Sequence, residues 1–377
     1  MKYYLIAGEA SGDLHGSNLI KAIKARDEHA VIHAWGGDLM EAAGAKLVKH
    51  FKDLAFMGFA EVIMHLPKIL GNLKFCKKDI LAFEPDVLIL IDYPGFNLRI
   101  AKWAKQEQFK IAYYISPQVW AWKESRVPAM KKNIDRMMVI LPFEKEYFKN
   151  KWNWDVAYVG HPLVEVVDTF YAHEQYEKLN EGFSKRVISL LPGSRKQEIS
   201  KKLPLMLEAS KSFSDYHFMI AKAPGVEDAF YENFTADYSN VTLVKNKTYA
   251  LLSIAIASLT TSGTATLETA LFGVPEVVCY KGSPVSYMIA KKLIKIKFIS
   301  LVNLIMDKEV VKELIQGQLT PQNITHELKK ILENKATIAR MKKDYEALKN
   351  ILSAGGNASA NAAAIIIDLA NEKKLDA

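Results

Sequence analysis

Residues 85–97 have the sequence PDVLILIDYPGFN, and this stretch decides the fold class. Its centre, Val87–Ile91, is an unbroken apolar run of strand length, which is typical of a strand covered on both faces of a parallel sheet. The run ends at Asp92, which is followed by a proline and a glycine. In open parallel sheets, ligands bind beyond the carboxyl ends of the strands. Asp92 is therefore a candidate general base, with a turn-forming or helix-capping residue as the alternative.

Strand and helix patterns alternate on both sides of this stretch. The expected strands cover residues 3–7, 31–35, 87–91, 110–115, 137–141, a short one before 158, then 186–191, 216–221, 241–244, 254–259 and 276–280. Such alternation predicts an α/β fold of two Rossmann-like, doubly wound domains that face each other across a deep cleft. The first spans 1–165 and the second 185–354, and an Ala/Ile-rich helix over 355–377 is able to pack back across the junction.

The composition restricts the partners and the compartment. A net charge of +8 over 377 residues favours an acidic partner, such as a phosphorylated substrate, an anionic membrane or nucleic acid. Cys76 and Cys279 are far apart, so neither a metal cluster nor a disulfide framework is expected, and a reducing cytoplasm is the natural compartment. The sequence shows no signal-peptide pattern and no apolar window of about 20 residues, the length of a membrane span.

Several residues of the first domain are candidates for an acceptor site or cleft. The glycine-rich turn at 8–16 lacks both the dinucleotide fingerprint and the P-loop pattern, so it either holds an anion or sugar hydroxyl at a helix start or only packs tightly. The two tryptophans near 120 either fill the core or line a pocket, and the histidine after the last short strand is either catalytic or structural. These candidates are Glu9, Ser11, Gly12, Asp13, Trp120, Trp122 and His161.

Two turns of the second domain have the composition of phosphate-binding loops. In LPGSRKQE (191–198), backbone N–H groups, the Ser194 hydroxyl and the Arg195 guanidinium converge at a helix start. In TTSGTATLE (260–268), the turn at Ser262, Gly263 and Thr264 can wrap a diphosphate. Glu268 either accepts hydrogen bonds from ribose hydroxyls or caps the helix. The sequence contains no D-x-D motif and no His/Cys cluster, so we expect no metal requirement.

Two segments combine bulky apolar residues with lysines, as surfaces that dip into a bilayer interface do. The first is 54–78, and its candidate membrane contacts are Met57, Phe59, Ile63, Leu66, Lys68 and Leu70. The second is 290–298. A buried interdomain or dimer helix is the alternative for the first, and nucleic acid is the competing partner for the second, although no nucleic-acid motif accompanies it.

Together these turns resemble a known family, the lipid-A-disaccharide synthases, which are bacterial glycosyltransferases of the GT-B type. The matching stretches span nearly the whole chain in the right order: GEASGD (8–13), MGFAEV (57–62), PDVLILIDYPGFN (85–97), YYISPQVWAW (113–122), LPFEKEYF (141–148), GHPL (160–163), LPGSRKQEI (191–199), SGTATLE (262–268) and KELIQ (312–316).

The resemblance implies a hexosyltransferase that moves 2,3-diacylglucosamine from its UDP derivative to 2,3-diacylglucosamine 1-phosphate, giving a β-1,6-linked disaccharide 1-phosphate and UDP. It implies a metal-independent, peripheral enzyme on the cytoplasmic face of the inner membrane, with a homodimer as one assembly and no nucleic-acid partner. Asp92 matches the family's proposed base, and Arg195 and Glu268 match nucleotide-side positions. Asn303 and Gln316 fall in stretches that resemble the active-site region, with 311–316 expected as a short helix.

The chain departs from the family pattern in three places. Gly95 stands where many members have a second acid, so Asp92 is the one acid of its turn. Gly37 and Val302 stand where prolines are usual. Two other functions remain open from the residues: a GT-B enzyme acting on a soluble UDP-sugar, such as a UDP-N-acetylglucosamine epimerase or N-acetylglucosaminyltransferase, and a non-catalytic nucleotide-binding module at a membrane surface.

Overall fold

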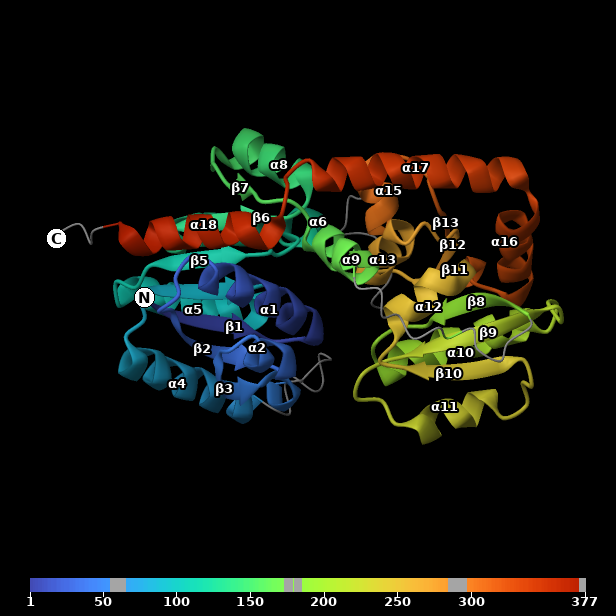
Figure 1. Ribbon diagram of the computed structural model, residues 1–377, viewed down its shortest axis with the longest axis horizontal. Coiled ribbons are helices and arrows are strands. Elements are labelled where there is room, and N and C mark those ends of the chain that lie inside the picture. Colours follow the sequence, from blue (N-terminus) through green and yellow to red (C-terminus); the bar gives the residue numbers. More distant parts are fainter. Residues whose placement is uncertain (55–65, 173–178, 180–184, 284–296, 373–377) are drawn as a thin grey trace. The chain divides into compact units, whose positions relative to one another are not determined.

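The chain folds into two α/β units (Figure 1). The computed structural model describes residues 1–54, 66–172, 179, 185–283 and 297–372. Unit 1 comprises Met1–Pro162 and Ser353–Ala377, and unit 2 comprises Leu163–Leu352. The last helix, α18 (Ala358–Asn371), therefore belongs to unit 1 although α17 (Lys335–Ser353) lies almost wholly in unit 2.

Unit 1 is built on a seven-stranded parallel sheet in the order β3-β2-β1-β4-β5-β6-β7. The strands are β1 (Lys2–Ala7), β2 (Val31–Gly36), β3 (Lys46–His50), β4 (Val87–Ile91), β5 (Ile111–Tyr114), β6 (Arg136–Val139) and β7 (Ala157–Tyr158). Central β4 is buried along its whole length and lies beside β1, with Ala7 paired to Ile91. The continuous apolar run predicted such a strand, because a parallel strand covered by helices on both faces has no solvent side.

Helices cover both faces of this sheet. One core cluster joins the sheet to Ile80 of α4, Ile100 of α5 and Phe148 of α8. The other joins it to Leu19 of α1 and Ile366 of α18. The helices of unit 1, apart from α18, are α1 (Ala10–Lys24), α2 (Asp38–Ala42), α4 (Leu66–Phe83), α5 (Pro94–Gln106), α6 (Val119–Trp122), α7 (Val127–Asn133) and α8 (Pro142–Trp152), with 3-10 turns at Phe51–Leu54 and Glu124–Arg126.

Unit 2 repeats the plan with a six-stranded parallel sheet in the order β10-β9-β8-β11-β12-β13. The strands are β8 (Arg186–Leu191), β9 (Tyr216–Lys222), β10 (Val241–Lys245), β11 (Ala255–Thr261), β12 (Glu276–Tyr280) and β13 (Lys312–Ile315). Besides α17, its helices are α9 (Pro162–Ala172), α10 (Lys196–Ser210), α11 (Asp228–Thr235), α12 (Thr248–Ile254), α13 (Thr264–Leu271), α15 (Leu301–Met306) and α16 (Pro321–Glu333), with a 3-10 turn at Gln316–Gln318.

The structure differs from the sequence-based expectation at several elements. The short helix expected over 311–316 is wrong: Lys312–Ile315 is the edge strand β13, which pairs with β12. Sheet pairing overrides the helical preference of Lys, Glu and Leu there. A further edge strand, β3, was not expected. The connection after the first domain is expected to be helical, and it does begin with the helix α9 (Pro162–Ala172), whose Phe170 packs against Phe272 of unit 2.

Three of the expected membrane contacts, Met57, Phe59 and Ile63, lie outside the described residues, as does 290–296 of the second apolar–basic segment. Leu66 is described only as the first residue of α4, and Trp122 only as the last residue of α6. Within the part of the chain that the structure describes, no helix is long and apolar enough to cross a membrane.

Candidate functional site

Asp92 lies in a tight turn at the carboxyl end of β4, beside the turn that follows β1. Asp92 and Tyr93 both have left-handed backbones, with φ of 42° and 49°. A side chain at Gly8 would place its Cβ 2.4 Å from the Tyr93 ring, so glycine is needed for the two turns to meet. The two turns bring Glu9 close enough for its charge to act on the Asp92 carboxyl.

The Asp92 carboxyl has the electrostatics of a base. Burial raises its pKa to about 6, the charge of Glu9 adds to the rise, and a hydrogen bond from the Tyr93 N–H opposes it. A carboxylate with such a pKa is still ionised at neutral pH, yet it is a stronger proton acceptor than an ordinary aspartate. The helix α5 begins at Pro94 with Tyr93 as its N-cap, so Asp92 is not the residue that caps it.

The backbone of the Asp92 turn is held from two sides. The Asn97 amide donates to the Asp92 carbonyl at 2.8 Å, and the Tyr113 hydroxyl donates to the same oxygen at 2.5 Å. Asn97 is completely buried and also donates to the Ile91 carbonyl. These bonds hold the backbone from which the Asp92 side chain extends.

A second carboxyl group near Asp92 escaped the sequence analysis. Glu144 in the first turn of α8 is 1 % exposed, and its oxygens accept hydrogen bonds from the Trp120 indole and the Leu141 N–H, both at 3.1 Å. Burial raises its pKa to about 7, and the negative charge of Asp92 contributes to the rise. Trp120, predicted to fill the core or line a pocket, is thus half-buried and held by Glu144. In the sequence, Glu144 stands three residues after Leu141, and an acid in that position indicates only a residue that caps the start of a helix.

His161 is 3 % exposed and lies next to His15 of α1, which is 5 % exposed. Burial lowers the pKa of His161 to about 3, with the charge of His15 contributing, and burial lowers that of His15 to about 4. Both imidazoles are therefore neutral at physiological pH. A group that holds a proton so weakly favours the structural interpretation of His161 over a general acid–base role.

The other candidates of the glycine-rich turn separate into roles. Asp13 is buried and accepts hydrogen bonds from the backbone N–H groups of Gly37, Leu39 and Met40, so it anchors the start of α2. Gly12 packs against Ala7, where a Cβ would approach to 3.0 Å. Ser11 is exposed in the first turn of α1. Of these candidates, Glu9 acts on Asp92 through its charge, whereas Asp13 has a structural role.

In unit 2, the turn after β8 carries exposed polar groups at the start of a long helix. Ser194 is exposed, and Arg195 is the N-cap of the 15-residue α10, which has no side-chain capping bond. The Arg195 guanidinium donates to Glu198 at 3.1 Å. A helix N-terminus with a guanidinium beside it suits a phosphate group, since both favour negative charge.

The turn after β11 is the second expected phosphate loop. Gly263 has a left-handed backbone with φ of 144° and is the N-cap of α13, which Thr264 begins. Gly263 and Thr264 are exposed, whereas the Ser262 hydroxyl donates to the Ile299 carbonyl at 2.8 Å. Glu268 is not a capping residue, because its carboxylate accepts the Tyr249 hydroxyl at 2.9 Å. Burial raises the pKa of Glu268, and the bond from Tyr249 opposes the rise.

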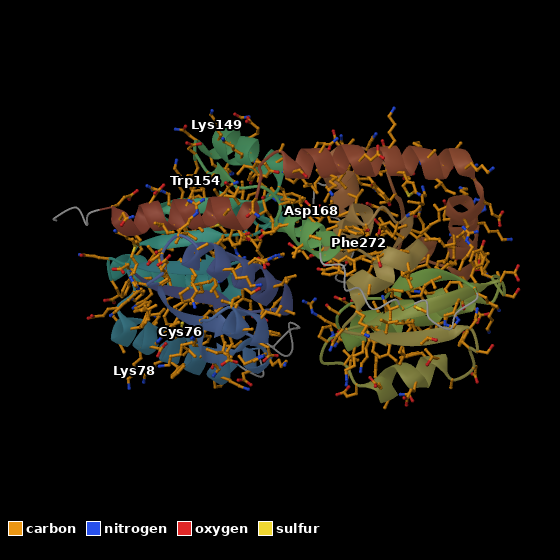
Figure 2. All side chains as sticks on the ribbon, viewed as in Figure 1. Cys76, Lys78, Lys149, Trp154, Asp168 and Phe272 are labelled. Carbon is orange, nitrogen blue, oxygen red and sulfur yellow. The ribbon has the colours of Figure 1, made fainter. Side chains whose placement is uncertain are left out.

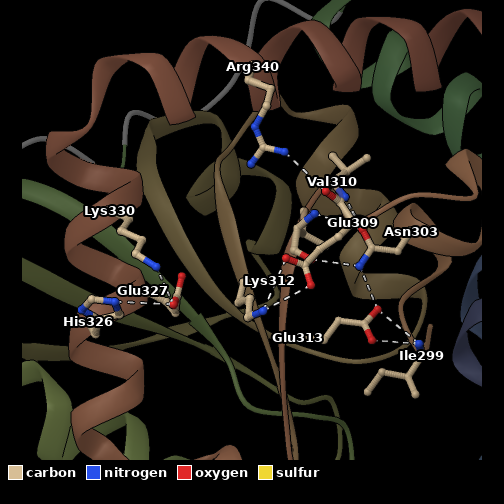
Figure 3. A network of polar contacts seen from close by, with 11 residues as sticks. Ile299, Asn303, Glu309, Val310, Lys312, Glu313, His326, Glu327, Lys330 and Arg340 are labelled. Atoms are coloured by element: carbon tan, nitrogen blue, oxygen red, sulfur yellow. Dashed lines mark hydrogen bonds and ion pairs between the residues drawn. The ribbon is translucent and has the colours of Figure 1, made fainter. Parts of the chain in front are cut away.

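Asn303 has all its hydrogen-bonding groups engaged inside unit 2 (Figure 3). Its amide donates to the Val311 carbonyl and to Glu313, and its oxygen accepts the N–H groups of Val310 and Val311. This arrangement leaves no bond for a nucleotide and favours a positioning role. Gln316 differs, because its buried Nε2 has no hydrogen-bond partner among the described residues.

The outer face of α4 continues the apolar–basic pattern. Figure 2 shows Lys78 on the outside of this helix and Cys76 on the side facing the sheet. The exposed residues of this face alternate bulky apolar groups with lysines: Lys68, Leu70, Lys74, Phe75, Lys78 and Leu81. Leu70 is 55 % exposed, Phe75 46 % and Leu81 47 %, so this face presents several bulky apolar groups together. Phe75 and Leu81 join the two expected contacts, Lys68 and Leu70.

Across the described ranges, no three His, Cys, Asp or Glu side chains come together in a way that would hold a metal ion. In unit 1 the carboxyls of Asp92 and Glu144 have raised pKa values, whereas in unit 2 Arg195 accompanies the helix N-termini after β8 and β11. Such a division fits a reaction that takes a proton from one substrate and stabilises a departing anion on the other.

Comparison with known proteins gives a consistent assignment. A family model for lipid-A-disaccharide synthetase matches residues 3–367. The lipid-A-disaccharide synthase of Syntrophus aciditrophicus is 40 % identical over 87 % of both chains, and that of Geobacter metallireducens is 36 % identical over 98 % of this chain and 97 % of its own. A solved kitacinnamycin glycotransferase, 15 % identical, covers 98 % of both chains with a TM-score of 0.66, and thus shares the GT-B fold.

The resemblance seen in the motifs is therefore confirmed over almost the whole length. The expectation of a glycosyltransferase with two Rossmann-like units is confirmed as well. The chain belongs to the lipid-A-disaccharide synthase family.

Proposed function

We propose that this chain condenses UDP-2,3-diacylglucosamine with 2,3-diacylglucosamine 1-phosphate, in the family's reaction, and that Asp92 is its general base. The observation that carries the proposal is the Asp92 turn: a carboxyl with a pKa near 6, fixed at a strand end beside Glu9. Family membership favours this reaction over a soluble UDP-sugar enzyme. The raised pKa of Asp92 and the hydrogen bonds that hold its turn argue against a non-catalytic module.

The proposed transfer is a single inverting displacement. The acceptor 6-hydroxyl oxygen bonds to the anomeric carbon as the bond from that carbon to the UDP oxygen breaks, and UDP leaves with the electron pair. Asp92 takes the hydroxyl proton. In this proposal, Arg195 and the N-termini of α10 and α13 in unit 2 stabilise the negative charge on the departing diphosphate, because a guanidinium and a helix N-terminus both favour negative charge.

We further propose that Glu268 and Gln316 bind the nucleoside. The Tyr249 hydroxyl engages one oxygen of Glu268, which leaves the other oxygen as an acceptor for a ribose hydroxyl. The amide of Gln316 supplies a donor that has no hydrogen-bond partner within the described part of the chain. In this proposal no metal takes part, so excess EDTA should leave the rate of UDP release unchanged.

The proposal includes no nucleic-acid partner. It also predicts a homodimer, which light scattering of the purified chain would test.

The membrane part of the proposal places the outer face of α4 on the cytoplasmic surface of the inner membrane, where acylated substrates reside. Lysines attract anionic headgroups, and Leu70, Phe75 and Leu81 enter the interface. Replacing Leu70 and Phe75 by serine should reduce flotation with anionic vesicles. The matched control is Leu39→Ser, because Leu39 is 46 % exposed but lies on α2. Unchanged flotation of the α4 variant would remove the docking claim.

The test of the reaction is acceptor-dependent UDP release from both acylated sugars in detergent. Wild type should release UDP and form the disaccharide 1-phosphate. Asp92→Asn should lower kcat by about 10²–10⁴-fold, the range for loss of a general base. Asp155→Asn is the matched control, because Asp155 is an exposed loop aspartate of the same unit. Full activity of Asp92→Asn would move the base elsewhere, with Glu9 as the next candidate.

A further inference from the structure

A buried lysine lies beneath the two turns to which the nucleotide is assigned. Lys202, in the second turn of α10, is 3 % exposed. Its ammonium donates a hydrogen bond to the hydroxyl of Thr261, the last residue of β11. Its closest acidic neighbour among the described residues is Glu198, with an oxygen 4.0 Å from the ammonium nitrogen. Lys202 therefore connects the turn after β8 to the turn after β11.

The buried ammonium of Lys202 would be stabilised by an anion. An ammonium group has three donors and no acceptor, and burying a charge is costly unless it is paired and hydrogen-bonded. One donor of Lys202 goes to Thr261. Among the residues that the structure describes, the one carboxylate within 4.0 Å of the ammonium is that of Glu198, which also accepts a hydrogen bond from Arg195 at 3.1 Å. The ammonium of Lys202 therefore has one hydrogen bond to a neutral hydroxyl and a carboxylate at the limit of ion-pair distance.

The loop residue next to the Lys202 ammonium, Gly193, has no side chain. Gly193 has φ of 130°, and a Cβ built there would lie 2.8 Å from a Glu198 oxygen and 3.3 Å from the Lys202 nitrogen. Because the Glu198 carboxylate and the Lys202 ammonium lie so close to this turn, only glycine fits at position 193. The ammonium thus lies directly against the loop whose N–H groups start α10.

The hydrogen bond to Lys202 also sets the direction of the Thr261 hydroxyl. Because an ammonium only donates, Thr261 must accept, and its own O–H is left to donate elsewhere. No acceptor for that O–H is found in the part of the chain that the structure describes, although Thr261 is only 9 % exposed. A buried hydroxyl with an unused proton at a strand end is a ready donor to a ligand oxygen.

We propose that Lys202 and Thr261 form a two-residue relay in the diphosphate site of the UDP-sugar. Lys202 fixes the Thr261 hydroxyl as its acceptor, Thr261 donates to a diphosphate oxygen, and the ammonium charge balances that of the diphosphate. Glu198 is the internal counter-ion of Lys202 and Arg195 when no nucleotide is bound. This inference rests on the proposed function, in which unit 2 binds UDP.

The test measures UDP binding to the full chain by calorimetric titration, without turnover. Lys202→Met removes the charge, and Thr261→Val removes the hydroxyl at constant shape. Both should raise the Kd for UDP by about tenfold or more, as expected for hydrogen bonds to charged groups. Because the two groups act in series, the double variant should lose little more than Lys202→Met. Lys201→Met, an exposed neighbour on α10, is the control and should bind as wild type does.

Thermal unfolding without nucleotide separates binding from folding. A purely structural Lys202 would lower the unfolding midpoint and leave the Kd unchanged, and that result would overturn the relay. If Lys202→Met fails to fold, Thr261→Val decides: wild-type UDP affinity in this variant contradicts the inference. If the wild-type chain binds no UDP, the proposed function fails together with the relay, whereas equal binding by wild type and both variants removes the relay alone.

Discussion

The buried histidine pair should make the stability of unit 1 depend on pH in a way that one substitution reveals. His15 and His161 are nearly inaccessible, and burial lowers their pKa values from 6.5 to about 4 and about 3. The unfolded chain therefore binds protons at these sites between about pH 6.5 and pH 4, while the folded chain does not. Their contribution to stability is complete above pH 6.5 and is lost as the pH falls through this window.

The expected size follows from the same values. At pH 5 an unfolded histidine with a pKa of 6.5 is almost fully protonated, whereas folded His161 is not. Linkage then removes RT ln(1 + 10^(6.5−5)), about 2 kcal/mol, from the free energy of unfolding for each such histidine. Asp92 and Glu144 act in the opposite direction, because their raised pKa values let the folded chain bind protons first. The wild-type pH profile alone is therefore no test.

The difference between wild type and His161→Gln isolates the histidine. Urea unfolding at pH 8 and pH 5, followed by tryptophan fluorescence, reports on unit 1 alone because all six tryptophans lie between residues 35 and 154. The stability advantage of wild type over the variant should shrink by about 2 kcal/mol between the two pH values. His29→Gln, at an exposed histidine, should change the profile little. Parallel pH profiles for wild type and His161→Gln would refute the reasoning.

Three further predictions concern single buried contacts. Asn303→Ala should destabilise unit 2 by about 3 kcal/mol, because it leaves several buried partners unpaired, with calorimetric unfolding as the measurement. Burial holds the pKa of Glu276 well above its usual value, so Glu276→Gln should raise the unfolding midpoint more at pH 8 than at pH 5; equal gains would contradict this sign. Gly8→Ala should lower kcat, because its Cβ would overlap the Tyr93 ring beside Asp92, and wild-type kinetics would show that the turn tolerates the methyl group.

Most of the fold could be predicted because the inner strands of both sheets carry their own apolar signal. Val87–Ile91, Arg186–Leu191 and Glu276–Tyr280 have the bounds that were expected from their apolar runs. The edges were harder, because an edge strand is stabilised by one neighbour and needs no apolar run. Lys312–Ile315 has a helix-forming composition and becomes a strand only through its pairing with β12.

The candidate site was predictable in its positions but less so in its roles. A residue's place at a strand end can be derived from local sequence, and this placed Asp92 and Arg195 correctly beyond β4 and β8. The role depends on partners far away in sequence. Asp13 holds a helix 25 residues further on, and Glu144 receives the Trp120 indole. Lys202 had no local signal at all, since a lysine in a helix is ordinarily exposed.

The Asp92 turn has a strained backbone that specific contacts stabilise. Left-handed backbone at two successive non-glycine residues, Asp92 and Tyr93, costs about 1–3 kcal/mol each and persists only where the surroundings enforce it. Here Asn97 and Tyr113 both donate to the Asp92 carbonyl, and Gly8 makes room for the Tyr93 ring. A capping residue or an ordinary turn would need none of these devices. The strain is maintained by the core of unit 1, and its effect is to hold a carboxyl with a raised pKa in one direction beside Glu9, which is what proton abstraction from a bound hydroxyl requires.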